Sequence, residues 1–327
     1  MKILVVGGAG YIGSHMVHLL NTSGYEAVVL DDFSAGHRDA VKNALVIEGS
    51  IKDRGLLDNL FTQHNFEAVM HFASSIQVGE SVRQPDLYYE NNFSNTLILL
   101  NAMIKAGIKK FIFSSTAAVY GDPLYTPIDE SHQKVPVNPY GRTKWMVEQA
   151  LSDYDSAYGL KSLTLRYFNA AGGMPQQGLG ERHEPETHLI PLVLQAASGR
   201  RQSISVFGSD YPTQDGTCVR DYIHVEDLCS AHLLALKKIL SGADSDQYNL
   251  GNGEGFSVQE VINCAKSVTA RDIKIEYSPR RPGDPAVLVA DSTKAKCALG
   301  WAPQRAELSE IIKDAWEWEI KHNWPLA

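Results

Sequence analysis

Tyr140 and Lys144 are the residues whose types and spacing point most directly to chemistry. They follow Asn138-Pro139, and because Asn is a good helix N-cap and Pro a good first helical residue, a helix is expected to begin there. Residues four apart share one helix face, so the two side chains should be neighbours. A free phenol, with a pKa of ~10, is a poor base at neutral pH, but a nearby ammonium and a helix N-terminus favour the phenolate. The pair predicts acid–base chemistry by Tyr140; a core tyrosine beside a surface lysine is the structural alternative.

Hydroxyl groups end the strand that is expected just before this helix, at Ser114-Ser115-Thr116. In a doubly wound sheet, ligands bind beyond the carboxyl ends of the parallel strands. We therefore expect these hydroxyls and Tyr140 to face the same bound molecule.

A glycine-rich segment, Gly7-Gly8-Ala9-Gly10-Tyr11-Ile12-Gly13, lies between an expected strand and an expected helix. It fits both G-x-G-x-x-G and G-x-x-G-x-x-G, spacings that let a backbone approach a pyrophosphate at a helix N-terminus. Asp31 closes the next strand, where a carboxylate accepts hydrogen bonds from adenosine ribose hydroxyls and repels a 2′-phosphate. The segment predicts NAD binding in preference to NADP, with a ligand-free glycine turn as the alternative. A P-loop NTPase is excluded, because no G-x-x-x-x-G-K-[ST] occurs.

The stretch His183-Glu184-Pro185-Glu186-Thr187-His188 resembles a helical zinc motif. Its histidines are five residues apart instead of four, and Pro185 would break the helix that such a motif needs. We therefore expect no metal site.

The elements that must position these residues alternate regularly over the first half of the chain. Short apolar strands are expected at residues 3–6, 27–30, 44–47, 68–70, 110–114 and 162–166, and amphipathic helices at 11–23, 53–63, 86–106 and 139–158. This alternation predicts an α/β fold with a doubly wound, parallel, Rossmann-type sheet covered by helices on both faces.

The rhythm changes after about residue 170. Helices are expected at 187–198, 225–240, 257–269 and 307–322, with strands at 203–207, 219–223 and 273–277. We expect an NAD-binding domain over residues 1–170 and a smaller, mixed α/β substrate domain over 171–327, with segments such as 219–241 free to pack back on the first.

Composition excludes several classes of protein. The 327 residues are 44% hydrophobic and carry a net charge of −8, which argues against a nucleic-acid partner. No apolar run approaches the ~18 residues of a membrane span. Four cysteines without a Cys-x-x-Cys pair are typical of a reducing compartment, so the expected location is the cytoplasm.

The motifs, together with His71-Phe72-Ala73-Ser74 and Val119-Tyr120-Gly121, resemble an extended short-chain dehydrogenase/reductase. Second-half motifs narrow the resemblance, over essentially the whole chain, to the UDP-glucose 4-epimerase family: Arg166-Tyr167-Phe168-Asn169, Thr187-His188-Leu189-Ile190-Pro191, Phe207-Gly208-Ser209-Asp210-Tyr211-Pro212-Thr213 with Asp215-Gly216-Thr217, Arg220-Asp221-Tyr222-Ile223-His224-Val225, and Arg280-Arg281-x-Gly283-Asp284.

The resemblance implies a tightly held NAD, a UDP-hexose bound between the domains, and interconversion of UDP-glucose and UDP-galactose. The sugar would be oxidised at C4, turned as the 4-keto sugar and reduced on its other face. Tyr140 would move the proton of the 4-hydroxyl, Thr116 would hold the same oxygen, and Lys144 would lower the pKa of Tyr140 and bond the nicotinamide ribose. The family also implies a homodimer through the helices at 86–106 and 140–158.

Carried over by position, the cofactor-binding residues would be Gly7, Gly10, Tyr11, Ile12, Gly13, Asp31, Asp32, Ser50, Ile51, Phe72, Ala73, Ser74, Asn91, Ser114, Tyr140, Lys144 and Tyr167. The substrate-binding residues would be Thr116, Asn169, His188, Leu189, Ser205, Phe207, Arg220, Tyr222, Arg281, Asp284 and Leu288. The sequence departs from the family at Ser50, where an acidic residue is common, and at Ile76, where many relatives have lysine.

Two rival functions are weighed. A nucleotide-sugar 4,6-dehydratase needs further acid–base groups, and Ala117-Ala118 stand where that family has Asp-Glu. A non-catalytic NAD-sensing protein typically loses the tyrosine or the lysine, and both are present here.

Overall fold

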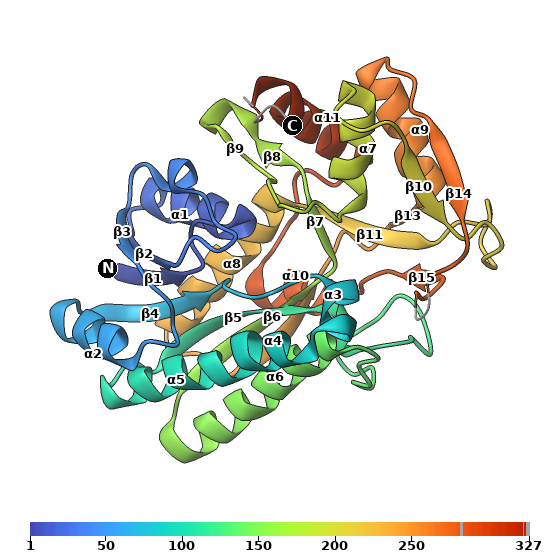
Figure 1. Ribbon diagram of the computed structural model, residues 1–327. Coiled ribbons are helices and arrows are strands. Elements are labelled where there is room, and N and C mark those ends of the chain that lie inside the picture. Colours follow the sequence, from blue (N-terminus) through green and yellow to red (C-terminus); the bar gives the residue numbers. More distant parts are fainter. Residues whose placement is uncertain (282–283, 323, 325–327) are drawn as a thin grey trace.

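The computed structural model describes residues 1–281, 284–322 and 324. Its centre is a seven-stranded parallel sheet in the order β12-β6-β5-β4-β1-β2-β3 (Figure 1). The strands are β1 (Lys2–Val6), β2 (Glu26–Asp31), β3 (Leu45–Glu48), β4 (Phe66–His71), β5 (Lys110–Thr116), β6 (Lys161–Tyr167) and β12 (Asp246–Leu250). The strand order reverses between β1 and β4, which makes the sheet doubly wound. The predicted α/β fold class is confirmed.

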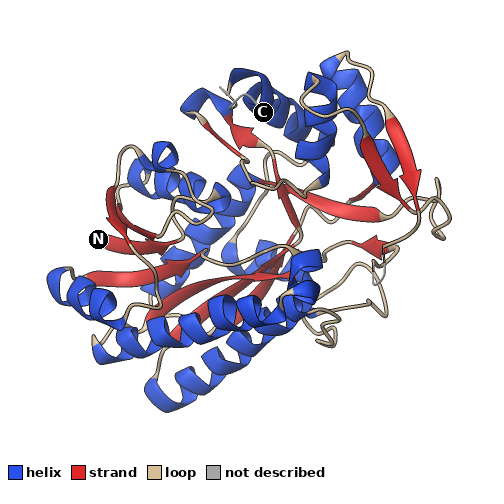
Figure 2. Ribbon diagram, viewed as in Figure 1, coloured by secondary structure: helices blue, strands red, loops and turns tan. Residues whose placement is uncertain are grey.

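Helices cover both faces of this sheet (Figure 2). Ile3 and Val5 pack into one core with α1 (Tyr11–Thr22) and α8 (Val225–Leu240). Leu4 and Val6 pack into a second core with α2 (Arg54–Gln63), α5 (Asn95–Lys105) and α6 (Pro139–Tyr158). Because successive side chains of a strand point to opposite faces, a strand buried on both sides is expected to be apolar, and β1 is apolar from Ile3 to Val6.

The expected helix at 86–106 is instead interrupted. After α3 (Val78–Arg83) the chain forms α4 (Pro85–Tyr88), a π-helical segment at Tyr89–Ser94 and then α5. Asn92 lies in the wide segment, where its side chain accepts from the Ser75 amide at 2.8 Å and donates to the Ser75 carbonyl at 2.9 Å. π-helical turns often occur at functional sites. This one places Asn91 and Asn92 together against the loop after β4.

The second half of the chain builds a smaller mixed part around a third core. Its main helices, α7 (Leu189–Ser198), α9 (Val258–Thr269) and α11 (Leu308–Lys321), pack against one another. Its strands are β7 (Asn169–Ala171), β8 (Gly173–Met174), β9 (Leu179–Gly180), β10 (Ile204–Phe207), β11 (Val219–His224), β13 (Gly255–Ser257), β14 (Ile275–Ser278) and β15 (Val287–Leu288). Among the described residues, no helix combines the length and apolar character needed to cross a membrane.

Two elements of this half lie against the large sheet instead. α8 packs on α1, and β12 pairs with β6 at the edge of the sheet, next to α10 (Thr293–Leu299). No strand is expected at residues 246–250 from the sequence, because Asp246-Gln247-Tyr248-Asn249-Leu250 has no apolar run. Pairing with β6 makes it a strand. The proposed boundary near residue 170 stays a prediction.

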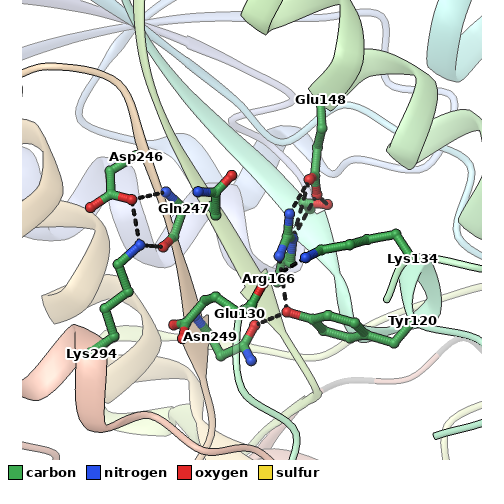
Figure 3. Close-up of polar contacts among 10 residues, drawn as sticks. Tyr120, Glu130, Lys134, Glu148, Arg166, Asp246, Gln247, Asn249 and Lys294 are labelled. Carbon is green, nitrogen blue, oxygen red and sulfur yellow. Dashed lines mark hydrogen bonds and ion pairs between the residues drawn. The ribbon is translucent and has the colours of Figure 1, made fainter. Parts of the chain in front are cut away.

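A buried ion pair ties α6 to the sheet. The Arg166 guanidinium on β6 contacts the Glu148 carboxylate on α6, with Nε 3.0 and 3.2 Å from its two oxygens (Figure 3). Only 1% of the Arg166 side chain and 5% of the Glu148 side chain are exposed. Arg166 also donates to the Tyr120 hydroxyl at 2.9 Å, and Tyr120 donates to Asn249 of β12 at 2.6 Å. One hydrogen-bonded network therefore fixes α6, β6 and β12 relative to one another.

We expect Arg166→Met to lower the free energy of unfolding by about 3–5 kcal/mol, because it leaves the Glu148 carboxylate buried without its cation. Urea unfolding followed by circular dichroism measures this. The double variant Arg166→Met/Glu148→Gln should recover part of the loss. Lys105→Met is the matched control: Lys105 pairs with Asp58 at the surface, and its loss should cost at most about 1 kcal/mol. Equal losses in the Arg166 and Lys105 variants would contradict the assignment.

Candidate active site

The glycine loop joins β1 to α1, and at two of its positions the backbone leaves no room for a side chain. Gly7 has a φ of +75°, and a Cβ there would lie 2.4 Å from the backbone nitrogen of Ala73. A Cβ on Gly13 would lie 2.1 Å from the Gly7 carbonyl oxygen. A Cβ on Gly10 meets nothing closer than 3.5 Å, and no side chain caps α1, whose N-cap is Gly10. The loop thus presents open backbone at a helix N-terminus, which suits a pyrophosphate.

Asp31, at the end of β2, stabilises the glycine loop through its carboxylate. One carboxylate oxygen accepts from the Ala9 amide at 2.8 Å and the other from the Phe33 amide at 2.9 Å. Burial raises the pKa of Asp31, and the two amides oppose that rise. Asp32 is exposed and accepts from the Ser34 amide at 3.0 Å. Both carboxylates lie at the end of β2, so Asp31 can accept a ribose hydroxyl only through lone pairs that the amides leave open.

The other predicted cofactor residues converge on the same edge from neighbouring strands. Ser50 and Ile51 follow β3, while Phe72, Ala73 and Ser74 follow β4. Ser114 lies near the end of β5, and Tyr167 ends β6. Asn91 comes from the π-helical segment and donates to Ser75 at 3.1 Å. Tyr11 and Ile12 begin α1, and the Tyr11 hydroxyl donates to the Gly172 carbonyl at 2.9 Å. The structure therefore brings together the residues that the sequence scattered over 160 positions.

Tyr140 and Lys144 lie in the first turns of α6, where Asn138 caps the helix through the Gly141 amide at 2.8 Å. Thr116, at the end of β5, lies close enough to the Tyr140 side chain for hydrogen bonding between them to lower the pKa of the phenol. Lys144 donates to the Ser74 hydroxyl at 2.6 Å and to the Ser114 carbonyl at 2.8 Å. The predicted Tyr140–Lys144–Thr116 group is therefore assembled at the carboxyl edge of the sheet.

The role expected of Lys144, which is to lower the pKa of Tyr140, stays a prediction. Burial raises the pKa of Tyr140, and hydrogen bonding with Thr116 opposes that rise. Lys144 is itself buried, which lowers its pKa from 10.5 to about 7, although the Glu148 carboxylate opposes this. Burial and the charge of Lys144 together lower the pKa of the neighbouring His71.

The predicted substrate residues come mainly from the smaller part. Ser205 and Phe207 lie two apart on β10, and the Arg281 guanidinium lies 3.9 Å over the Phe207 ring. Arg220 on β11 donates to an Asp284 carboxylate oxygen at 2.9 Å. Of the Arg280-Arg281-x-Gly283-Asp284 motif, Gly283 lies outside the described residues.

The other predicted substrate residues lie on β7, α7, β15 and β11. Asn169 on β7 donates to the Asp221 carbonyl at 2.9 Å, and Leu189 begins α7. Leu288 on β15 packs against the cluster that contains Ala117 and Tyr120, directly after Thr116. Tyr222 does not line the site in the same way, because it is buried in the third core with 4% exposure.

The stretch from His183 to His188, for which the sequence predicts no metal site, forms a cluster with Glu181. Glu181, His183, Glu186 and His188 each offer an oxygen or nitrogen atom within 4.8 Å of the others. Burial disfavours charged imidazoles, yet the carboxylates raise the pKa of His183 to about 9 and of His188 to about 10. A signal did exist in the sequence, because three acids and two histidines fall within the eight residues 181–188.

A pH dependence of stability follows from Lys144. Its pKa is about 7 when folded and about 10.5 when exposed, so between these values the unfolded chain binds a proton that the folded chain does not. This group therefore makes the protein more stable as pH rises from about 7 to 10.5, and its contribution is constant below that window. In Lys144→Met this alkaline contribution should be absent. Urea midpoints at pH 6, 8 and 10 test it, with the exposed Lys105→Met as control; parallel curves for the wild type and Lys144→Met would contradict it.

Comparison with known proteins agrees with the geometry. Residues 3–251 match the family model described as "NAD dependent epimerase/dehydratase family". The UDP-glucose 4-epimerase of Rhizobium leguminosarum bv. trifolii is 54% identical over 98% of both chains. A crystal structure of a UDP-glucose 4-epimerase superposes with a TM-score of 0.96 at 50% identity, over 98% of each chain.

A further solved structure carries ligands. The UDP-glucose 4-epimerase of Bifidobacterium longum, in complex with NAD+ and UDP, is 37% identical, with a TM-score of 0.92 over 98% of each chain. With a family model that spans most of its length and full-length relatives at this identity, the chain belongs to the NAD dependent epimerase/dehydratase family and, within it, to the UDP-glucose 4-epimerases.

Proposed function

We propose that this chain interconverts UDP-glucose and UDP-galactose by inverting C4 of the hexose, with Tyr140 as its acid–base group. The observation that carries the proposal is the meeting of the glycine loop with Tyr140, Lys144 and Thr116 at one edge of the sheet. Phosphate binding and proton transfer are thereby available to one bound molecule, and the full-length relatives are named UDP-glucose 4-epimerases.

The chain uses NAD, and its residues fit that cofactor. The open backbone at Gly10 and the uncapped start of α1 suit the pyrophosphate. The buried Asp31 disfavours the extra phosphate of NADP. When bound, NAD supplies a two-electron acceptor and donor for C4, and its positively charged oxidised ring favours a phenolate nearby.

Tyr140 takes the proton of the sugar 4-hydroxyl and later returns it. The Thr116 hydroxyl, bonded to the phenol, holds the reacting oxygen and stabilises negative charge on Tyr140. Lys144 links the loop after β4 to the end of β5 through Ser74 and Ser114, and this fixes the base of the cofactor site. Its ammonium also has a donor to offer to a ribose hydroxyl.

The nucleotide end of the substrate is held by the smaller part. Arg220 and Arg281 supply cations for the diphosphate, so a chain with net charge −8 can still bind a dianion. Phe207 offers an aromatic face to uracil. Tight binding of the nucleotide with loose binding of the hexose lets the 4-keto sugar turn while it stays attached.

Neither rival function is favoured by the site. Ala117 and Ala118 form a short helical turn after Thr116, and neither carries the acid that elimination of water needs. A non-catalytic NAD sensor would not need the Tyr140–Thr116 contact. Incubation with UDP-galactose and measurement of UDP-glucose separates all three, because only an epimerase forms that product.

A homodimer, a cytoplasmic location and the division into an NAD-binding and a UDP-sugar-binding domain belong to the same proposal. Val82 on α3 and Leu87 on α4 are 63% and 39% exposed, on helices that contact α6. This apolar surface beside α6 supports pairing there. All four cysteines are free, which suits a reducing compartment. Sedimentation velocity at micromolar concentration should show twice the chain mass; a single-chain species would refute the dimer.

Tyr140→Phe should lower kcat by at least ~10²-fold, because it removes a positioned acid–base group. UDP binding, measured by calorimetry, should persist. Tyr158→Phe is the matched control, since Tyr158 lies on the same helix and is 50% exposed. Near-normal turnover of the Tyr140 variant would remove Tyr140 from the mechanism.

We expect UDP-N-acetylglucosamine to be a minor substrate. Leu288 is intermediate in volume between a tyrosine, which would close the pocket to an N-acetyl group, and a small residue such as alanine, which would leave room for it. Leu288→Tyr should lower kcat/KM for the N-acetylated sugar relative to UDP-glucose, and Leu288→Ala should raise it. Differences of one or two methylenes are worth ~1–3 kcal/mol, or about 10–200-fold. The ratio of the two kcat/KM values is the measurement. If neither variant moves that ratio, residue 288 does not control access.

A further inference from the structure

The loop between β9 and α7 gathers four side chains that the proposed chemistry does not use as a group. They are Glu181, His183, Glu186 and His188, and β9 and α7 both contact α11 nearby (Figure 1). The loop is fixed from outside as well. The Glu181 carbonyl accepts from the Trp318 indole at 2.8 Å, and the Arg182 carbonyl lies 3.2 Å from the His37 ring.

Two of these side chains are carboxylates that water hardly reaches. Only 6% of the Glu181 side chain and 5% of the Glu186 side chain are exposed. Buried carboxylates need compensating positive charge. Arg182, which follows Glu181 in the chain, directs its guanidinium to Asp39 at 2.6 Å instead. Either two protonated imidazoles or one divalent cation would balance the pair.

The distances match those of a metal site. The Nδ1 atom of His183 lies 3.3 Å from Glu181 and 3.5 Å from Glu186. The Nδ1 atom of His188 lies 2.7 Å from Glu181 and 3.2 Å from Glu186. Zinc bonds of about 2.0–2.2 Å in a tetrahedron place neighbouring ligand atoms about 3.3–3.5 Å apart. Three of the four separations are about that value, although His183 faces the Oε2 atom of Glu186 and His188 its Oε1 atom. Binding of one ion would therefore need the Glu186 carboxylate to turn and the His188–Glu181 separation to widen.

His183 supplies an independent observation. Its Nδ1 atom is buried and has no hydrogen-bond partner among the described residues, although two carboxylates lie within 3.5 Å. The Nδ1 atom of His183 thus lies between two carboxylates without a hydrogen bond to either, which is a position that a metal ligand can take.

We propose that Glu181, His183, Glu186 and His188 form a structural site for Zn²⁺. The spacing and Pro185 exclude a helical zinc motif, and residues 183–188 indeed contain no helix. Neither observation excludes a zinc site in a loop, where local turns set the spacing of the ligands. Two imidazoles and two carboxylates leave no open position, as is usual for structural zinc sites. The ion would take no part in epimerisation, so the inference goes beyond the proposed function.

The site would also fix the orientation of one substrate residue. His188 is the N-cap of α7, and its Nδ1 atom faces the cluster. With Nδ1 bound to a metal, the proton must reside on Nε2, which becomes a fixed donor. That atom is then available to an anionic ligand such as a diphosphate.

The test uses the full-length protein without a polyhistidine tag. After treatment with EDTA and desalting, it is titrated with Zn²⁺ alone, and bound zinc is counted by mass spectrometry of the metal. We expect one equivalent per chain and a higher melting temperature that EDTA reverses. His183→Gln and Glu186→Gln should each lose the equivalent, with folding checked by circular dichroism. His64→Gln, a histidine outside the cluster, and Cys297→Ser, which removes an exposed thiol, should keep it.

Three results would overturn the proposal. These are substoichiometric zinc in the wild type, retention of the equivalent in both cluster variants, or nuclear magnetic resonance spectra in which His183 and His188 remain imidazolium in the presence of Zn²⁺. Activity on UDP-galactose is assayed in parallel. Turnover by the zinc-free protein would leave the proposed function intact. A chain that binds one equivalent of zinc but forms no UDP-glucose would support the zinc site and refute the proposed function.

Discussion

The buried ion pair between Glu148 and Arg166 is the interaction on which the arrangement of this active site depends. Glu148 lies one turn beyond Lys144 and two beyond Tyr140 on α6. Arg166 stands on β6, so their contact sets the depth and rotation of the helix relative to the sheet. Such a pair gains little over apolar packing, but losing one partner is costly. The main effect of the pair is therefore to select one position for α6, and its contribution to net stability is small.

The same pair affects the electrostatics of the site. Glu148 also accepts from the Ser115 hydroxyl on β5, between the strand residues that contact Lys144 and Tyr140. Its negative charge opposes the fall in the Lys144 pKa that burial causes. A helix anchored in this way holds the half-buried phenol of Tyr140 beside Thr116. Proton transfer needs that fixed geometry more than it needs a strong base.

The two halves of the molecule meet through main-chain contacts as well as through side chains. Residues 128 and 290 form a parallel bridge, and the Asp291 amide donates to the Ile128 carbonyl at 2.8 Å. These contacts bring Leu288 to the cluster just after Thr116. Arg220 and Asp284, from segments 64 residues apart, are joined by an ion pair at 2.9 Å. The fold therefore sets the relative position of these segments.

The sequence by itself determined the alternating strands and helices, the glycine loop, and the group of Tyr140, Lys144 and Thr116. These depend on local rules, since periodicity, capping and φ-restricted turns are written in neighbouring residues. Only the tertiary structure decided the strand at Asp246–Leu250, the π-helical segment around Asn92 and the pKa of Tyr140. Each depends on partners distant in the chain or on burial, and no local pattern encodes the desolvation of a side chain or the pairing of a polar segment with a distant strand.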